Sequence, residues 1–231
     1  MRAVPSVPKI RKLLVANRSE IAIRVFRAAN ELGIRTVAVW AEEDKYALHR
    51  FKADESYQVG RGPHLAKDMG PIESYLSIEE VIRVARLSGA DAIHPGYGLL
   101  SESPEFADAC AEAGIVFIGP RPETMRRLGN KVAARNLAIE IGVPVVPATD
   151  PLPDDIEAVK KLAAQIGYPL MLKASWGGGG RGMRAIREEA DLAREVTEAR
   201  REAKAAFGKD EVYLEKLVER ARHVEVQVLG D

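Results

Sequence analysis

The stretch Pro169-Leu-Met-Leu-Lys173-Ala-Ser-Trp176 leads directly into Gly177-Gly-Gly-Gly180-Arg-Gly-Met183. An apolar run that ends in a lysine predicts a buried strand, and the four successive glycines predict a loop after it. Glycine loses more conformational entropy on ordering than any other residue, so this run is costly unless the backbone must approach a ligand closely. Successive unhindered N–H groups can surround an anion, usually a phosphate, and Lys173 would add a positive charge. The stretch therefore predicts a phosphate-binding loop.

Other glycine-rich loops fit this pattern less well. A Walker A loop would close with Gly-Lys-Ser or Gly-Lys-Thr, and this loop does not. The dinucleotide fingerprint has a different glycine spacing and opens directly into a helix. A flexible linker would also be rich in glycine. Linkers, however, seldom carry an apolar strand on one side and Arg181-Gly-Met183 on the other, so we favour the phosphate loop.

Strand and helix patterns alternate in the first half of the chain. The run Lys12–Ala16 predicts a buried strand, and the apolar spacing after it predicts a helix that Ser19 caps and Gly33 ends. Such alternation predicts a doubly wound parallel sheet with helices on both faces, so the first domain is α/β. The turn Asn17–Glu20 has no glycine, which argues against NAD binding there. The other expected elements are strands 36–40, 92–94 and 116–118 and helices 77–88 and 104–113.

Two loops should meet where the strands of this sheet end. Asn17-Arg18 follows the first strand, and Gly96-Tyr-Gly98 follows the strand that contains His94. Ligands of parallel sheets gather at this carboxyl edge. His94 has no second histidine or cysteine close by in the sequence, so we expect it to pack structurally and not to bind a metal.

The pattern changes after Gly119-Pro120. We expect one or two helices over 123–141, an extended stretch over 143–147 and a helix over 154–166. A return strand over 183–187 and a long charged helix over 188–207 should follow the glycine loop, and strand 211–216 comes next. The last segment, 223–228, alternates strictly and predicts a strand with His223 on its polar side.

The composition excludes several classes of protein. Lysine plus arginine and aspartate plus glutamate each number 34, so the formal net charge is zero and we expect no nucleic acid partner. The apolar runs are only as long as strands, so we expect no membrane span. Residues 1–11 read as a flexible tail without the apolar core of a signal peptide. The single Cys110 lies in a helical stretch and fits a packed thiol in a reducing compartment, which suggests a cytoplasmic protein.

The chain resembles the ATP-grasp biotin carboxylases. The resemblance is carried by the glycine loop and by further motifs in the same order as in that family: Val15–Ala22, Ala92–Gly98, Leu100–Glu102, Phe117–Pro120, Asn130–Val132, Glu215–Lys216 and His223–Gln227. It implies a Rossmann-like biotin carboxylase N-terminal domain over 12–122. The first part of an ATP-grasp domain follows over 123–231, with a glycine-rich lid at about 145–207. We expect this second domain to be incomplete.

The resemblance also implies which residues bind ATP. Lys131 and Lys173 match its nucleotide lysines, and Lys173 would lie by the α-phosphate and the adenine. Glu215–Val218 resembles the strand that reads adenine through its main chain. Family members hold Mg²⁺, and place their general base, on segments that would come after residue 231, so we expect no catalytic residue, no metal ligand and no activity in this fragment. The implied ATP ligands are Lys131, Lys173, Gly179, Gly180, Glu215, Lys216, Leu217, Val218 and His223.

The implied reaction uses MgATP and bicarbonate to carboxylate biotin, which would be attached elsewhere in the parent protein. Segments 49–55 and 70–76 resemble family members that convert pyruvate to oxaloacetate. Biotin carboxylases for acetyl-CoA or propionyl-CoA remain an alternative, as does a stand-alone nucleotide-binding module without catalysis. The expected partners are a biotinylated carrier domain, the remaining carboxylase domains and further copies of the parent in a homo-oligomer.

Overall fold

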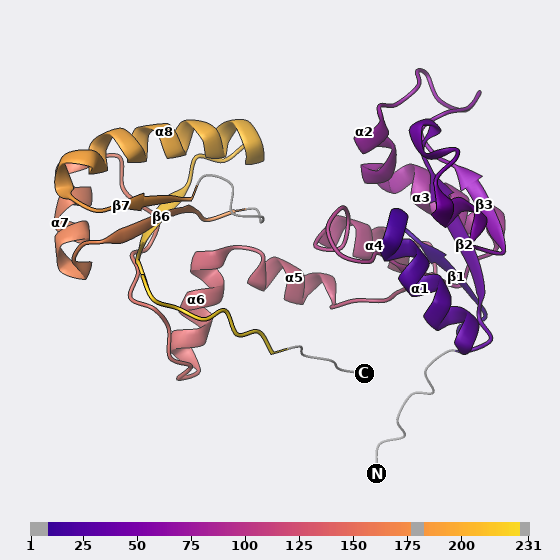
Figure 1. Ribbon diagram of the computed structural model, residues 1–231, viewed down its shortest axis with the longest axis horizontal. Coiled ribbons are helices and arrows are strands. Elements are labelled where there is room, and N and C mark those ends of the chain that lie inside the picture. The colour runs from indigo at the N-terminus through magenta and orange to yellow at the C-terminus, as the bar shows by residue number, and fades with distance from the viewer. Residues whose placement is uncertain (1–8, 177–182, 227–231) are drawn as a thin grey trace, which may run out of the picture. The chain divides into compact units, whose positions relative to one another are not determined.

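The computed structural model describes residues 9–176 and 183–226. It divides the chain into two compact units, Met1–Arg126 and Arg127–Asp231 (Figure 1). The predicted phosphate loop, including Gly179 and Gly180, lies outside the described residues. Most of the predicted tail over 1–11 also lies outside them.

A five-stranded parallel sheet forms the centre of the first unit, as the alternating sequence pattern predicts. The strand order is β3-β2-β1-β4-β5, and every neighbouring pair is parallel. The sequence pattern does not indicate β3, because this edge strand is only partly buried and carries polar residues in place of an apolar run. The strands are β1 (Lys12–Val15), β2 (Arg35–Trp40), β3 (Glu55–Gln58), β4 (Ala92–His94) and β5 (Val116–Phe117).

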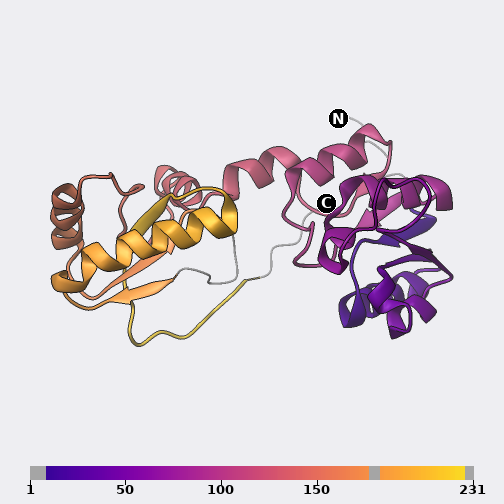
Figure 2. The same ribbon diagram turned by 90° about the horizontal axis from the view of Figure 1, so that it is seen from above.

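Helices cover both faces of this sheet (Figures 1 and 2). Successive side chains of a strand point to opposite faces. Leu13 therefore joins the cluster that contains Phe26 of α1, whereas Leu14 joins the cluster that contains Phe106 of α4. This confirms the doubly wound arrangement. The helices are α1 (Ser19–Glu31), α2 (Pro71–Leu76), α3 (Ile78–Ser88), α4 (Pro104–Glu112) and α5 (Pro122–Leu128), with short 3-10 turns η1 (Glu42–Asp44) and η2 (Leu48–Phe51).

The start of α1 differs from the prediction. Arg18 is the cap residue, and Ser19 is already the first helical residue, with a φ of 52°. The Asn17 side chain accepts the Arg18 N–H at 2.9 Å, while Asp44 accepts two bonds from the Arg18 guanidinium at 2.6 and 2.5 Å. The expectation that Ser19 caps the helix was therefore wrong, because long-range contacts of Arg18 set where the helix begins.

The carboxyl ends of β1 and β4 meet, as the sequence predicts. The Asn17 side chain is only 1% exposed and donates to the carbonyl oxygens of Pro95 and Tyr97 at 2.7 and 2.9 Å. Gly96 has a φ of +67°, and a Cβ there would lie 2.6 Å from Ile21 Cγ2. The loops that follow β1 and β4 are therefore joined directly to each other at this edge of the sheet.

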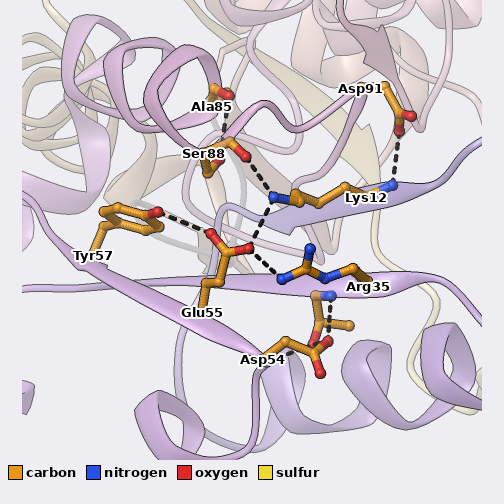
Figure 3. Close-up of polar contacts among 9 residues, drawn as sticks. Lys12, Arg35, Asp54, Glu55, Tyr57, Ala85, Ser88 and Asp91 are labelled. Atoms are coloured by element: carbon orange, nitrogen blue, oxygen red, sulfur yellow. Dashed lines mark hydrogen bonds and ion pairs between the residues drawn. The ribbon is translucent and has the colours of Figure 1, made fainter.

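The amino edge of the same sheet is held by Glu55 (Figure 3). One of its oxygens accepts from Lys12 Nζ and from the Arg35 guanidinium, both at 2.8 Å, and the other accepts from the Tyr57 hydroxyl at 2.9 Å. Lys12 and Tyr57 in particular hold the pKa of the Glu55 carboxyl below its ordinary value. Lys12 also donates to the Ser88 carbonyl oxygen at 2.6 Å, so one cluster links three strands to the end of α3.

A three-stranded antiparallel sheet with the order β7-β6-β8 organises the second unit. Its strands are β6 (Leu170–Ala174), β7 (Arg184–Ile186) and β8 (Val212–Lys216). Helices α7 (Ile156–Ile166) and α8 (Glu189–Phe207) contribute to one core with Leu170, Leu172 and Leu214 (Figure 1). The segment before α7 runs along the free edge of β8, where the Thr149 N–H donates to the Leu214 carbonyl oxygen at 2.8 Å.

Helix α6 (Lys131–Glu140) lies within the helical stretch predicted over 123–141, and helix α7 begins two residues after the predicted start at residue 154. Each has a side-chain cap, from Asn130 and Asp155 respectively. The strand expected over 223–228 was wrong as far as the structure describes it, because residues 221–226 have no regular secondary structure. Val224 and Val226 are 75% and 83% exposed, so alternation alone did not provide the partner that a strand needs.

Candidate functional site

The candidate site lies on the face of the β6–β8 sheet that is opposite to its core. Along β6, Leu170, Leu172 and Ala174 enter the core, so the intervening Lys173 points to the other face. Along β8, Val212 and Leu214 likewise enter the core, and Tyr213 and Glu215 point away from it. We call Lys173, Tyr213 and Glu215 the polar face.

An ion pair is the main feature of the polar face. Lys173 Nζ donates to Glu215 Oε1 at 2.7 Å, and the two side chains are 23% and 22% exposed. Tyr213 lies directly across from Lys173, with its hydroxyl 3.5 Å from the other Glu215 oxygen. Burial is the main reason that the pKa of Tyr213 is raised to about 12, so its hydroxyl stays protonated. A cation and a carboxylate thus offer a hydrogen-bond donor and an acceptor side by side.

The Lys216 side chain points to a different part of the unit. Its Nζ donates to the carbonyl oxygens of Gly167 and Tyr168, both at 2.9 Å, where α7 ends. A lysine is favourable there because the last carbonyls of a helix carry partial negative charge. The Lys216 side chain therefore stabilises the end of α7. If Lys216 contributes to ligand binding, it does so through its main chain.

The main chain just after β8 includes an N–H group that has no backbone partner in the described structure. The N–H groups of Lys216 and Leu217 donate to Pro147 and Pro169 at 2.8 and 3.1 Å. The Val218 N–H has no backbone partner among the residues that the structure describes, and the Val218 side chain is 53% exposed. An extended segment with such an N–H group next to the polar face can bind the edge of a heterocyclic base.

Lys131 lies close to the end of β6. Asn130 caps α6, and the Lys131 N–H donates to the Ser175 carbonyl oxygen at 3.0 Å. Ser175 follows Lys173 by two positions, so the structure brings both predicted lysines to the same end of the sheet. Two positively charged residues where the predicted phosphate loop begins suit a polyphosphate.

His223 is not part of this cluster in the described structure. Its side chain is 82% exposed and lies 3.0 Å from the Glu225 carboxylate. Its role as a nucleotide ligand therefore stays a prediction. The same is true of Gly179 and Gly180, which lie outside the described residues.

Sequence reasoning included Asn130 only as part of the motif Asn130–Val132. It did not single out Glu211 and Tyr213, which lie at the site, or Arg135, whose charge acts on Tyr213. Arg135 lies in α6, and its guanidinium is 3.3 Å from Asp150. Tyr213 sits among apolar residues and looks like a core residue in sequence. The one available signal was Asn130 directly before a helical pattern, which is typical of a cap.

The remaining histidine and cysteine side chains of the first unit have structural surroundings. Within residues 9–176 and 183–226, no group of three or more histidine, cysteine, aspartate or glutamate side chains could hold a metal ion. His94 accepts the Gly96 N–H at 2.9 Å on its Nδ1, which is the structural role that the sequence predicts. Cys110 is fully buried, and burial raises the pKa of its thiol to about 12. No helix in this part of the chain is long and apolar enough to cross a membrane.

Comparison with known families identifies the chain. The family model described as biotin carboxylase, N-terminal domain, matches residues 9–125, which is more than half of the 231 residues. The chain belongs to the biotin carboxylase family. The model described as carbamoyl-phosphate synthase L chain, ATP binding domain, matches residues 130–231, which include the polar face. The resemblance that the sequence motifs indicated is therefore confirmed, and so is the α/β fold of this family.

Relatives of known function are similar over nearly the whole chain. Pyruvate carboxylase of Bacillus subtilis is 53% identical over 226 residues, which cover 98% of this chain and 19% of the relative. Mitochondrial pyruvate carboxylase of Mus musculus is 51% identical over 222 residues, which cover 96% of this chain and 18% of the relative. This biotin carboxylase family member thus spans about one fifth of the length of these relatives.

Two solved structures are also similar. A variant of Rhizobium etli pyruvate carboxylase with the allosteric activator acetyl coenzyme A is 83% identical, with a TM-score of 0.85, and the match covers 91% of this chain and 18% of that one. The biotin carboxylase domain dimer of Hydrogenobacter thermophilus 2-oxoglutarate carboxylase, in complex with MgADP, ADP and bicarbonate, is 45% identical. Its TM-score is 0.84, and the match covers 91% of this chain and 45% of that one.

Proposed function

We propose that this chain is the N-terminal portion of a biotin-dependent carboxylase and contributes part of its ATP site. The parent protein would use MgATP and bicarbonate to carboxylate biotin, and pyruvate would then receive the carboxyl group to give oxaloacetate. The observation that carries the proposal is the Lys173–Glu215 pair beside the main chain of Lys216–Val218. The names of the relatives support the same reaction.

The polar face matches adenine better than guanine. One edge of adenine presents the N7 acceptor next to the N6 amino donor, whereas guanine presents two acceptors, N7 and O6. Lys173 can donate and Glu215 can accept, so the pair complements adenine and would repel guanine O6. Lys131 at the start of α6 would bind on the phosphate side, together with the backbone of Gly179 and Gly180.

In the proposed reaction, a bicarbonate oxygen attacks the γ-phosphorus of ATP, ADP leaves, and carboxyphosphate forms. The carboxyl group then passes to biotin and phosphate is released. The part that falls to this chain is to bind and orient the nucleotide. A lid over about 145–207 that closes on ATP would keep water from the reactive carboxyphosphate. Biotin would be carried on a domain of the parent, and Mg²⁺ would neutralise the phosphates.

The domain limits and partners belong to the same proposal. We infer an N-terminal domain over 12–122 and the first part of an ATP-grasp domain over 123–231. The proposed partners are the biotinylated carrier domain, the remaining carboxylase domains and further copies of the parent. We infer a cytoplasmic location, although the mouse relative is named as mitochondrial.

Nucleotide selectivity tests the proposed site in the 231-residue chain. Trp176 borders the predicted phosphate loop, and Lys209 Nζ lies 3.4 Å from the centroid of its ring, so a ligand there should change its fluorescence. Replacing the other tryptophan, Trp40→Phe, removes the background signal. We expect a saturable change with ATP and at least about tenfold weaker binding of GTP. A lack of any saturable response, or equal responses to both nucleotides, would count against the site.

The acceptor is tested separately in the full-length parent. We expect that polypeptide to carry covalent biotin and to form oxaloacetate from pyruvate, bicarbonate and MgATP, and not to carboxylate acetyl-CoA. Carboxylation of an acyl-CoA instead would overturn the pyruvate assignment. The assignment of the ATP site would still stand, because it depends on Lys173 and Glu215 and not on the carboxyl acceptor.

A further inference from the structure

A closed ring of hydrogen bonds joins the three chain segments that meet at the candidate site. The Lys131 N–H donates to the Ser175 carbonyl oxygen, and the Ser175 N–H donates to the Glu211 carbonyl oxygen, both at 3.0 Å. The Asn130 side chain closes the ring, because its Nδ2 donates to Glu211 Oε1 at 3.1 Å. The ring therefore ties the start of α6 to the end of β6 and to the residue before β8.

Asn130 uses both ends of its amide. Its Oδ1 accepts the N–H groups of Val132 and Ala133, each at 2.9 Å, and so caps α6. Its Nδ2 is then the only part that can donate to the Glu211 carboxylate. An aspartate would cap a helix equally well, so capping alone does not require an amide at this position. The donor to Glu211 does require one.

The ring includes a buried residue whose side chain makes no hydrogen bond in the described structure. Ser175 is fully buried, and its hydroxyl has no hydrogen-bond partner in the part of the chain that the structure describes. Its place is set by two backbone bonds, one to Lys131 and one to Glu211. Ser175 is also the second residue before the glycines of the predicted phosphate loop. Movement of the ring would therefore move the base of that loop relative to Lys131.

We propose that Asn130 is a positioning residue for nucleotide binding, and that it acts by bridging α6 to Glu211. The inference rests on the proposed ATP site, because it concerns how Lys131 and Lys173 are held together. Asn130 itself need not touch the nucleotide. Its amide keeps the first turn of α6, which carries Lys131, at a fixed distance from the strand that carries Lys173.

The substitution Asn130→Asp separates this role from capping. It keeps an oxygen for the N–H groups of α6 but replaces the donor with a second carboxylate facing Glu211. The double variant Asn130→Asp with Glu211→Gln reverses the polarity, since the glutamine amide can donate to the aspartate. Asp155→Asn is the control for a change at a helix cap outside the ring, because Asp155 caps α7 by accepting the N–H groups of Glu157 and Ala158, one on each carboxylate oxygen.

We expect Asn130→Asp to weaken ATP binding about tenfold in the Trp176 fluorescence assay, because a hydrogen bond to a charged group is lost. The ATP affinity of the double variant should return to within about twofold of that of the unsubstituted 231-residue chain, and Asp155→Asn should bind ATP as that chain does. Unchanged affinity in Asn130→Asp would overturn the proposal. Failure of the double variant to recover would overturn the pairing with Glu211. A mere loss of the cap would not be rescued by Glu211→Gln.

A second measurement needs no nucleotide. Hydrogen exchange of the Lys131 and Ser175 amides reports how often the ring opens. We expect exchange at both amides to be about tenfold faster in Asn130→Asp and to be restored in the double variant. If the unsubstituted 231-residue chain does not bind ATP, the proposed function fails. The exchange result still decides whether Asn130 positions the ring. Unchanged exchange would overturn that role.

Discussion

Replacing Lys173 by methionine separates its contribution to folding from its contribution to nucleotide binding. Methionine keeps the length of the apolar stem and removes the charge. In the structure, Lys173 Nζ is 2.7 Å from Glu215, and each side chain is less than a quarter exposed. The variant therefore loses an ion pair and leaves the Glu215 carboxylate unpaired.

The two effects differ in size and in how they can be reversed. For folding we expect a loss of roughly 1–2 kcal/mol, between the values for exposed and for buried pairs. Adding Glu215→Gln should recover part of this loss, because no unpaired charge then remains. For ATP binding, a hydrogen bond to a charged group contributes about 1.5–3 kcal/mol, so Kd should rise roughly 10- to 150-fold. Adding Glu215→Gln should not recover ATP binding.

Calorimetric titration with ATP and urea unfolding measure these two effects on the same 231-residue chain. Lys160→Met is the matched control, since Lys160 also forms a 2.7 Å pair, with Glu157 on the exposed side of α7. We expect that control to bind ATP with the same affinity as the unsubstituted 231-residue chain. If the Kd of Lys173→Met for ATP were within twofold of that of the unsubstituted 231-residue chain, Lys173 would be a structural lysine. The proposed role of the polar face in ATP binding would then be refuted.

Three further predictions concern the first unit. Asn17→Ala removes the buried bonds that join the ends of β1 and β4 and should destabilise the chain by about 2–3 kcal/mol in urea unfolding, whereas Asn30→Ala on the exposed side of α1 should change little. Burial lowers the pKa of His49 and of His94 in the folded chain. Their contribution to the free energy of unfolding is therefore fully present above the unfolded-state pKa of about 6.5 and is lost as pH falls through the lower folded-state pKa. Unfolding curves from pH 8 to 5 that show equal stability would contradict this. Cys110, with a pKa of about 12, should react with a thiol reagent only as fast as the chain unfolds, and rapid labelling of the folded chain would show that the thiol is accessible.

Strongly periodic segments could be predicted from the sequence. Buried parallel strands such as Lys12–Val15 are continuous apolar runs, and helices such as Ile78–Ser88 show helical spacing with a cap at one end. The family could be predicted as well, because the motifs from Val15 to Gln227 keep their order. The edge strand Glu55–Gln58 could not be predicted, because its polar residues form no apolar run. It is a strand because its backbone pairs with β2, and the sequence pattern does not show that pairing.

The sequence by itself therefore determined the α/β class, the doubly wound first half and the candidate lysines, because those depend on local periodicity and on motifs. Tertiary structure alone decided what the site residues contact. It paired Lys173 with Glu215 across two strands, directed Lys216 to the end of α7, and joined Asn130 to Glu211 over a separation of 81 residues. Such contacts depend on strand register and on how a helix packs against a sheet, and neither is recorded in the spacing of residues along the chain.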